Sequence, residues 1–252
     1  MFSLAPEFQI LWYEWAMVLF AALLIGFSKA GIKGIAVVSV TLLALVYGAK
    51  ASTGILMPML IAADIYAIIY YRNDVIWKHI YRLMPWMVAG VLLGTWIGKD
   101  LPEDIFRQGM AIIILLTVGM MYWWDRQKEV KVPEGLWFSS IMGLAAGFTT
   151  MIGNLAGPFS NLYFLAMRLP KNEFIGTAAW LFFFINLFKL PFHIFVWETI
   201  SLESFKVNLF IYPALFFGLI IGVKLIRMIK DDLFRKMVIL LTAIGAIAIF
   251  FK

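Results

Sequence analysis

Ten apolar segments follow one another along this sequence, separated by short clusters of charged, glycine and proline residues. A helix needs about 20 mostly apolar residues to cross the hydrocarbon core of a bilayer, and most of the segments approach that length. The sequence therefore predicts an all-α membrane protein. The segments cover roughly residues 11–27, 34–47, 53–71, 83–98, 106–124, 136–152, 155–168, 174–195, 207–225 and 233–251.

Composition excludes the main soluble classes of protein. Hydrophobic residues make up 63% of the 252 residues and charged residues only 14%, against roughly 25% charged residues in an ordinary soluble domain. Basic residues on the cytoplasmic loops of a membrane protein explain the net charge of +6, so we expect a lipid bilayer and no nucleic acid as partner. With 0 Cys and 2 His, we expect no metal site and no cofactor.

Two of the segments, 34–47 and 155–168, are short, and each follows a break that contains glycine. The breaks read GFSKAGIKG at 26–34 and GFTTMIGNLAGP at 147–158. A short helix beside such a break predicts a broken or re-entrant helical hairpin. Non-helical backbone at membrane depth is tolerated only where protein or a wet cavity surrounds it.

The chain repeats itself, with matches that stay in order along both halves. The halves lie at 1–124 and 136–252, joined by a polar cytoplasmic linker at 125–135, and we expect them to form one membrane domain. The matched pairs are Gly26-Phe27 with Gly147-Phe148 (offset 121), Asp64-Ile65-Tyr66 with Asn186-Leu187-Phe188 (122), Gly94 and Gly98 with Gly218 and Gly222 (124), and Glu103–Arg107 with Asp231–Arg235 (128).

Basic residues gather in the loops after the odd-numbered segments, which predicts that these loops are cytoplasmic and that both termini lie on the other side. Five segments per half is an odd number, so the second half should be inverted relative to the first. The charges agree, because loop 72–82 is richer in basic residues than its counterpart 196–206, whereas 99–107 is poorer than 224–236. Inverted repeats with broken helices are typical of secondary transporters, whose sites lie near the midplane at the repeat interface.

The two breaks also indicate what such a site binds. A helix N-terminus carries free N–H donors and about half a positive charge, and both short helices would bring theirs toward the middle. The surrounding hydroxyl, amide, glycine and lysine residues include no carboxylate, which favours an oxyanion over a cation. The candidate substrate-binding residues are Ser28, Lys29, Gly31, Lys33, Gly34, Thr149, Thr150, Gly153, Asn154, Gly157, Thr177, Asn186 and Lys189.

Charged residues inside the segments are candidates for coupling. Asp64 lies mid-segment, where insertion of a charged side chain into the bilayer costs about 2.5–3.5 kcal/mol. Such a residue either binds a coupling ion or proton or forms an ion pair with a buried cation. Lys189 shares a helix face with Asn186. It either faces the anion or forms an ion pair with Asp64 across the repeat interface.

Structural roles are the alternative for other candidates. His193 continues the face of Lys189 as a coupling or gating residue, or it lies at the membrane interface because it is near a segment end. Lys29 and Lys33 bind the substrate or mark the cytoplasmic side. Asn154 and Asn186 bind the substrate or satisfy free backbone groups of a broken helix.

The paired motifs resemble those of the TauE/SafE family of sulfite exporters. GFSKAGIKG and TTMIGNLAGP are each followed by a helix and by Thr53-Gly54 or Gly176-Thr177, and the resemblance covers about residues 15–250. The Gly-Gly-Gly run common in that family is replaced here by Gly153-Asn154-Leu155-Ala156-Gly157. The resemblance implies a multi-pass permease of the bacterial cytoplasmic (inner) membrane that exports sulfite, an organosulfonate or a related small sulfur oxyanion. A coupling proton or ion and a homodimer are further expectations.

The alternative functions differ in the residues that they require. A permease for another small anion or a carboxylate would use the same constellation. A cation transporter needs several intramembrane carboxylates, and Asp64 alone lies deep in a segment. A membrane-embedded enzyme needs paired carboxylates, a His-Glu metal motif or a Gly-x-Ser-x-Gly elbow, and the sequence has none of these. We therefore expect a transporter and not an enzyme.

Overall fold

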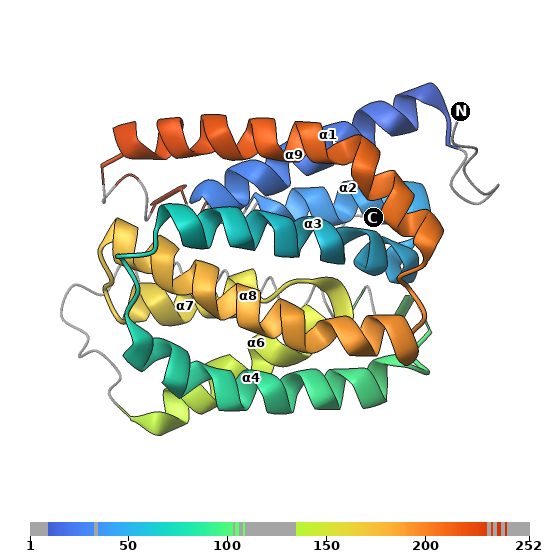
Figure 1. Ribbon diagram of the computed structural model, residues 1–252. Helices are drawn as coiled ribbons and strands as arrows, with labels where there is room; N and C mark the ends of the chain where they lie inside the picture. The colour runs from blue at the N-terminus through green and yellow to red at the C-terminus, as the bar shows by residue number, and fades with distance from the viewer. Residues whose placement is uncertain are drawn as a thin grey trace.

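The computed structural model describes residues 10–32, 35–102, 104–105, 108, 135–230, 233, 236–237 and 240. In this part of the chain all regular structure is helical, as the sequence predicts (Figure 1). The expected segments 106–124 and 233–251 and the linker 125–135 fall outside the described residues, apart from isolated positions. The helices are α1 (Trp12–Ala30), α2 (Ala36–Tyr47), α3 (Ala49–Tyr70), α4 (Trp77–Gly98), α6 (Leu136–Gly153), α7 (Gly157–Ala166), α8 (Lys171–Phe195) and α9 (Leu202–Met228).

Six of these helices, α1, α3, α4, α6, α8 and α9, are long and apolar enough to cross a bilayer. The shortest has 18 residues, which extend about 27 Å at 1.5 Å per residue. In contrast, α2 has 12 residues and α7 has 10, too few to cross about 30 Å of hydrocarbon. The two short segments expected from the sequence are therefore short helices, and the chain is a multi-pass membrane protein.

Each short helix follows a break where the glycine clusters predict one. Helix α1 ends at Ala30, and Gly31 follows with a φ of 134°. Helix α6 ends at Gly153, and Asn154 follows with a φ of 56°. Positive φ favours glycine and is tolerated by asparagine, so both breaks are encoded locally. Pro158 fits the first turn of α7, where a missing N–H costs no helical hydrogen bond.

The helices pack as two groups that do not coincide with the two halves of the sequence. Figure 1 shows α1 and α9 along one side, α4 and α6 along the opposite side, and α3 and α8 between them. The first helix group, α1, α2, α3 and α9, shares an apolar core that includes Met59 and Leu215. The second helix group, α4, α6, α7 and α8, shares another that includes Met87 and Ala146. Each half thus gives its fourth helix to the group of the other half.

Glycines let the paired helices cross with their backbones in contact. A Cβ atom at Gly26 of α1 would lie 2.3 Å from the carbonyl oxygen of Leu215 on α9. A Cβ atom at Gly147 of α6 would lie 2.0 Å from the carbonyl oxygen of Met87 on α4. Small residues allow this close packing of helices in membranes. Gly26 and Gly147 are matched in the sequence repeat, so matched positions make corresponding crossings.

The glycines on the partner helices correct the register of the repeat. Gly90 of α4 lies against α6 and Gly218 of α9 lies against α1, and these two residues are 128 positions apart. Pro85 inside α4 and Pro213 inside α9 have the same separation. The offset of 124 expected from the sequence in this region is therefore wrong by one helical turn, because glycines spaced every four residues can be aligned in two ways.

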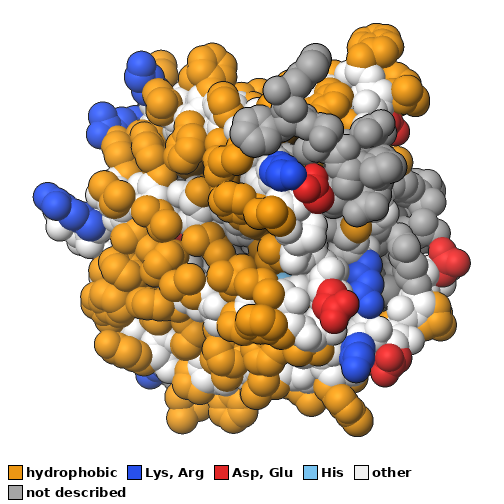
Figure 2. Space-filling model, turned by 45° about the vertical axis from the view of Figure 1, so that its right-hand side comes forward, with side chains coloured by type: hydrophobic (Ala, Val, Ile, Leu, Met, Phe, Trp, Pro, Cys, Tyr) orange, Lys and Arg blue, Asp and Glu red, His pale blue; other side chains and the backbone are white. Residues whose placement is uncertain are grey.

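The outer surface of the bundle suits lipid. Figure 2 shows hydrophobic side chains gathered over the left half of the face in view, with charged side chains at its left edge and among the side chains of its right half. Trp96 is 79% exposed and Phe195 is 77% exposed. Soluble proteins rarely expose an apolar area of this extent, whereas a bilayer covers it.

Candidate functional site

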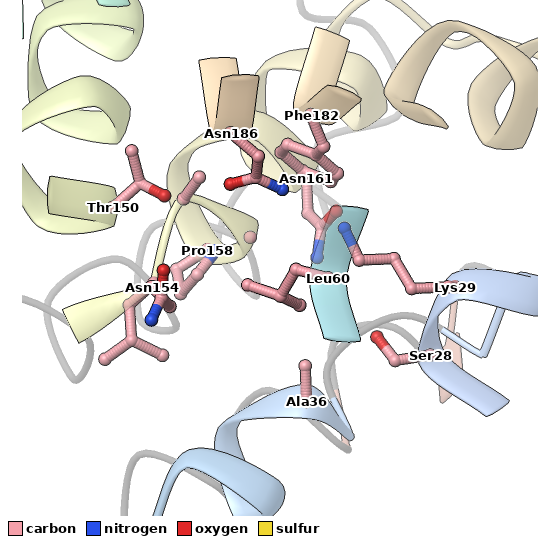
Figure 3. Close-up of a pocket in the computed structure, with 13 residues that line it drawn as sticks. Ser28, Lys29, Ala36, Leu60, Thr150, Asn154, Pro158, Asn161, Phe182 and Asn186 are labelled. Carbon is pink, nitrogen blue, oxygen red and sulfur yellow. The ribbon is translucent and has the colours of Figure 1, made fainter. Parts of the chain in front are cut away.

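A cavity of about 60 Å³ lies between the two helix groups (Figure 3). One water needs about 10–15 Å³ of such space, so the cavity has room for a few water-sized groups or a small polyatomic ion. The first helix group lines it with Ser28, Lys29, Ala36 and Leu60, and the second helix group with Thr150, Asn154, Leu155, Ala156, Gly157, Pro158, Asn161, Phe182 and Asn186.

The N-termini of both short helices border this cavity. Ala36 is the first residue of α2 and Gly157 is the first residue of α7, and both line the cavity. The residues before them, Ile35 and Ala156, have no polar side chain with which to cap the helices. No side chain at the residue before either helix therefore competes with a ligand for the free N–H donors of the first turn.

Lys29 reaches the cavity from the end of α1 as part of a buried ion pair. Its Nζ lies 2.6 Å from Oδ1 of Asp64 and 4.9 Å from the centre of the Phe182 ring. Asn186 donates from Nδ2 to the other carboxylate oxygen of Asp64 at 2.7 Å. The expectation that no carboxylate accompanies the candidate site is therefore wrong, since Asp64 contacts two residues that line the cavity.

A loop residue fixes the end of α1, next to Lys29. The hydroxyl of Tyr71, just after α3, donates to the carbonyl oxygen of Ala30 at 2.8 Å. Burial raises the pKa of Tyr71 above its ordinary value, so the hydroxyl stays protonated at neutral pH and retains this hydrogen bond.

Lys189 is fully buried in α8 and binds the second helix group. Its Nζ donates to the carbonyl oxygen of Thr150 at 2.8 Å, to the Thr150 hydroxyl at 3.0 Å and to Oδ1 of Asn154 at 2.7 Å. The Lys189–Asp64 ion pair considered from the sequence is not formed, because Asp64 pairs with Lys29 of its own half.

The candidate substrate-binding residues divide into those that line the cavity and those that do not. Gly31 and Gly153 stand at helix ends without lining the cavity. Lys33 and Gly34 fall outside the described residues. The lining members are Ser28, Lys29, Thr150, Asn154, Gly157 and Asn186.

Thr149 and Thr177 make hydrogen bonds that hold the fold together. The hydroxyl of Thr149 lies 2.8 Å from the carbonyl oxygen of Ala145 and 3.0 Å from that of Leu155. The hydroxyl of Thr177 accepts a hydrogen bond from the Ile76 N–H at 2.9 Å. Neither residue lines the cavity.

His193 lies inside the helix bundle. Its exposed fraction is 0%, so the ring does not lie on the outer surface of the bundle. Nδ1 lies 2.9 Å from the Thr199 hydroxyl, and Nε2 has no hydrogen-bond partner among the described residues. Packing between the end of α8 and the following loop buries this ring, which its place near a segment end did not predict.

Sequence reasoning left several lining residues out of the candidate set. Asn161, whose Oδ1 has no hydrogen-bond partner in the described part of the chain, lies one turn after Gly157. Phe182 lies one turn before Asn186, so the four-residue spacing of a helix face would have found both. Leu60 had no sequence signal. Among the described residues, no three His, Asp or Glu side chains come together to hold a metal ion.

A known protein family matches nearly the whole chain. The sequence pattern described as sulfite exporter TauE/SafE matches residues 18–249. The chain belongs to the TauE/SafE family. The resemblance inferred from the paired glycine motifs is thereby confirmed, and this TauE/SafE member joins a family of membrane transporters named for sulfite export. Searches among curated proteins and among solved structures found no match.

Proposed function

We propose that this TauE/SafE member is a secondary transporter that exports a small sulfur oxyanion, either sulfite or an organosulfonate, across the cytoplasmic membrane. The cavity between the two helix groups is its binding site in this proposal. The observation that carries it is that the Lys29 ammonium and the N-termini of α2 and α7 border one small cavity. Helix N-termini and lysine both stabilise negative charge.

The charge balance around the cavity supports an anion. Lys29 and Lys189 contribute two positive charges and Asp64 one negative charge, so these three residues sum to one positive charge. A monoanion would neutralise it, whereas a cation would add a second uncompensated charge in a medium where burial of charge is costly. The chemical type of the lining, with hydroxyl and amide donors from Ser28 and Asn161, suits an oxyanion.

Asp64 gives this proposal a coupling step. An entering anion competes with Asp64 for the Lys29 ammonium, because the two side chains are paired at 2.6 Å. Protonation of Asp64 would release Lys29 and favour the anion. A proton and an anion would then bind together, as expected for proton-coupled transport.

The packing of the helices supports alternating access. The cavity is lined from both helix groups, and each group has an apolar core of its own. Movement of one group against the other would open the cavity to one side at a time. We further propose that the halves are inverted, with both termini on the non-cytoplasmic side. The corresponding helix crossings at Gly26 and Gly147 support the repeat, and the distribution of basic residues among the loops supports the orientation.

The test is sulfite efflux from proteoliposomes that contain the purified chain. Lys29→Met should lower efflux and sulfite affinity at least tenfold, because one charge-assisted hydrogen bond contributes about 1.5–3 kcal/mol. Lys206→Met is the matched control, since Lys206 pairs with Glu203 at a partly exposed site. The double variant Lys29→Met/Asp64→Asn removes both buried charges and guards against a misfolded single variant.

Two outcomes would overturn the proposal. Wild-type protein that is stabilised by none of sulfite, sulfate, thiosulfate or methanesulfonate in a thermal-shift assay does not bind small sulfur oxyanions. A Lys29→Met variant that transports as well as wild type would exclude the lysine from the site and favour the cation-transporter alternative.

A further inference from the structure

Lys189 places a positive charge next to the cavity without bordering it. Its side chain is 0% exposed and is absent from the cavity lining. An ammonium group has three N–H donors, and the contacts with Thr150 and Asn154 use all of them. A ligand in the cavity would therefore receive no hydrogen bond from Lys189.

These contacts determine what Thr150 presents to the cavity. Because the Thr150 oxygen accepts a hydrogen bond from Lys189 at 3.0 Å, its own hydrogen has to point elsewhere. Thr150 lines the cavity, and Figure 3 shows its hydroxyl directed from α6 toward the space beside Asn186 and Pro158. The hydroxyl is thus available as a donor to a ligand.

The amide of Asn154 is fixed by the same lysine. Its Oδ1 accepts from Lys189 at 2.7 Å, and its Nδ2 donates to the carbonyl oxygen of Thr53 at 3.2 Å. Both ends of the amide are used, so its acceptor oxygen is kept from an anion. Lys189 therefore removes two acceptors, Thr150 and Asn154, from one wall of the cavity.

We propose that Lys189 is a positioning residue that keeps the Thr150 hydroxyl turned as a hydrogen-bond donor to the oxyanion. This inference rests on the proposed function, since it requires an anion in the cavity. Without the ammonium, the Thr150 hydroxyl can donate to the carbonyl oxygen of Ala146, one turn earlier in α6. Its lone pairs would then face the cavity and oppose an anion.

The test is a double-mutant cycle on the full chain in detergent, with methanesulfonate binding measured by calorimetry. Thr150→Val should weaken binding about tenfold, the effect of one lost hydrogen bond, and Lys189→Met at least tenfold, because it also removes a positive charge from beside the cavity. The double variant should be no weaker than Lys189→Met alone, because both changes remove the same donor. Thr150→Ser, which retains the hydroxyl, should bind within about twofold of wild type, and Lys206→Met is the control.

The outcomes separate this inference from the proposed function. Wild-type binding with a double variant about tenfold weaker than Lys189→Met would overturn the positioning role and show that Lys189 and Thr150 act on the ligand independently. If Lys189→Met does not fold, Thr150→Val decides alone, and affinity equal to that of wild type would overturn the inference. A wild-type chain that binds no methanesulfonate, sulfite or sulfate would overturn both proposals.

Discussion

Asn186 of α8 donates a hydrogen bond from Nδ2 to Oδ2 of Asp64 of α3, with 2.7 Å between the two atoms. The two residues are matched in the internal repeat at an offset of 122, so equivalent positions of the two halves touch beside the cavity. One position carries a carboxylate and the other a carboxamide. Only Asp64 of this pair can take up a proton, and its ion-pair partner is Lys29.

Methanesulfonate should bind more tightly as the pH falls. Protonation of Asp64 frees Lys29 for the anion, and we expect about a tenfold gain in affinity when one charge-assisted contact is released. Methanesulfonate stays a monoanion at every pH used for the measurement, so the charge of the ligand does not change. Calorimetry at several pH values measures the effect.

Asp64→Asn is the control for this pH dependence. The variant should bind methanesulfonate with an affinity that is independent of pH and close to that of wild type at low pH. A variant that retains the wild-type pH dependence would assign the titration to another group, and His193 would be the next residue to test.

Gly147→Ala should destabilise the fold much more than Gly157→Ala. A Cβ atom at Gly147 would lie 2.0 Å from a backbone oxygen of α4, so the helices must separate, at a cost of about 1–3 kcal/mol or more. A Cβ atom at Gly157 has its nearest neighbour, Asn161 Nδ2, at 3.9 Å. Thermal unfolding in detergent compares the two variants.

The Gly157→Ala variant also tests whether the cavity binds the oxyanion. Gly157→Ala should unfold near the wild-type temperature while its added methyl group lowers oxyanion affinity. Equal unfolding temperatures for the Gly147 and Gly157 variants would contradict the close crossing of α4 and α6.

Thr177→Val should lower stability without changing oxyanion affinity. The substitution keeps the shape of the side chain but removes the acceptor of the Ile76 N–H, which lies 2.9 Å away. An unsatisfied donor costs about 1–3 kcal/mol, and the lower end applies because Ile76 is only partly buried. Thr177→Ser keeps the acceptor and should restore the unfolding temperature.

The opposite result would indicate that Thr177 belongs to the binding site. A Thr177→Val variant with wild-type stability and weakened oxyanion binding would contradict the structural role described above and support the role expected from the sequence.

The sequence predicted the features that depend on local chemistry. Helix length and apolar composition are local, so the six long helices and the two short ones were found. The breaks at Gly31 and Asn154 follow from residues that accept positive φ. Lys29 and Thr150, polar residues within one turn of these breaks, were recovered as neighbours of one cavity for the same reason.

Features that depend on which helix faces meet were not predicted. The cation considered as an ion-pair partner of Asp64 lies in the other half, yet the partner is Lys29, because the end of α1 packs near the middle of α3. The three acceptors of Lys189 were likewise hidden, since two belong to backbone and side chain of a single threonine. Nothing in the sequence repeat indicates that α4 packs with helices of the second half and α9 with helices of the first half.

This exchange of α4 and α9 has a mechanical consequence. In the described residues the chain passes from one helix group to the other through residues 71–76, between α3 and α4, and through residues 196–201, between α8 and α9. The first segment rests on Gly176 at the start of α8, and the second rests on Gly54 at the start of α3. Under the proposed alternating access, any displacement of one group against the other has to bend these two connections.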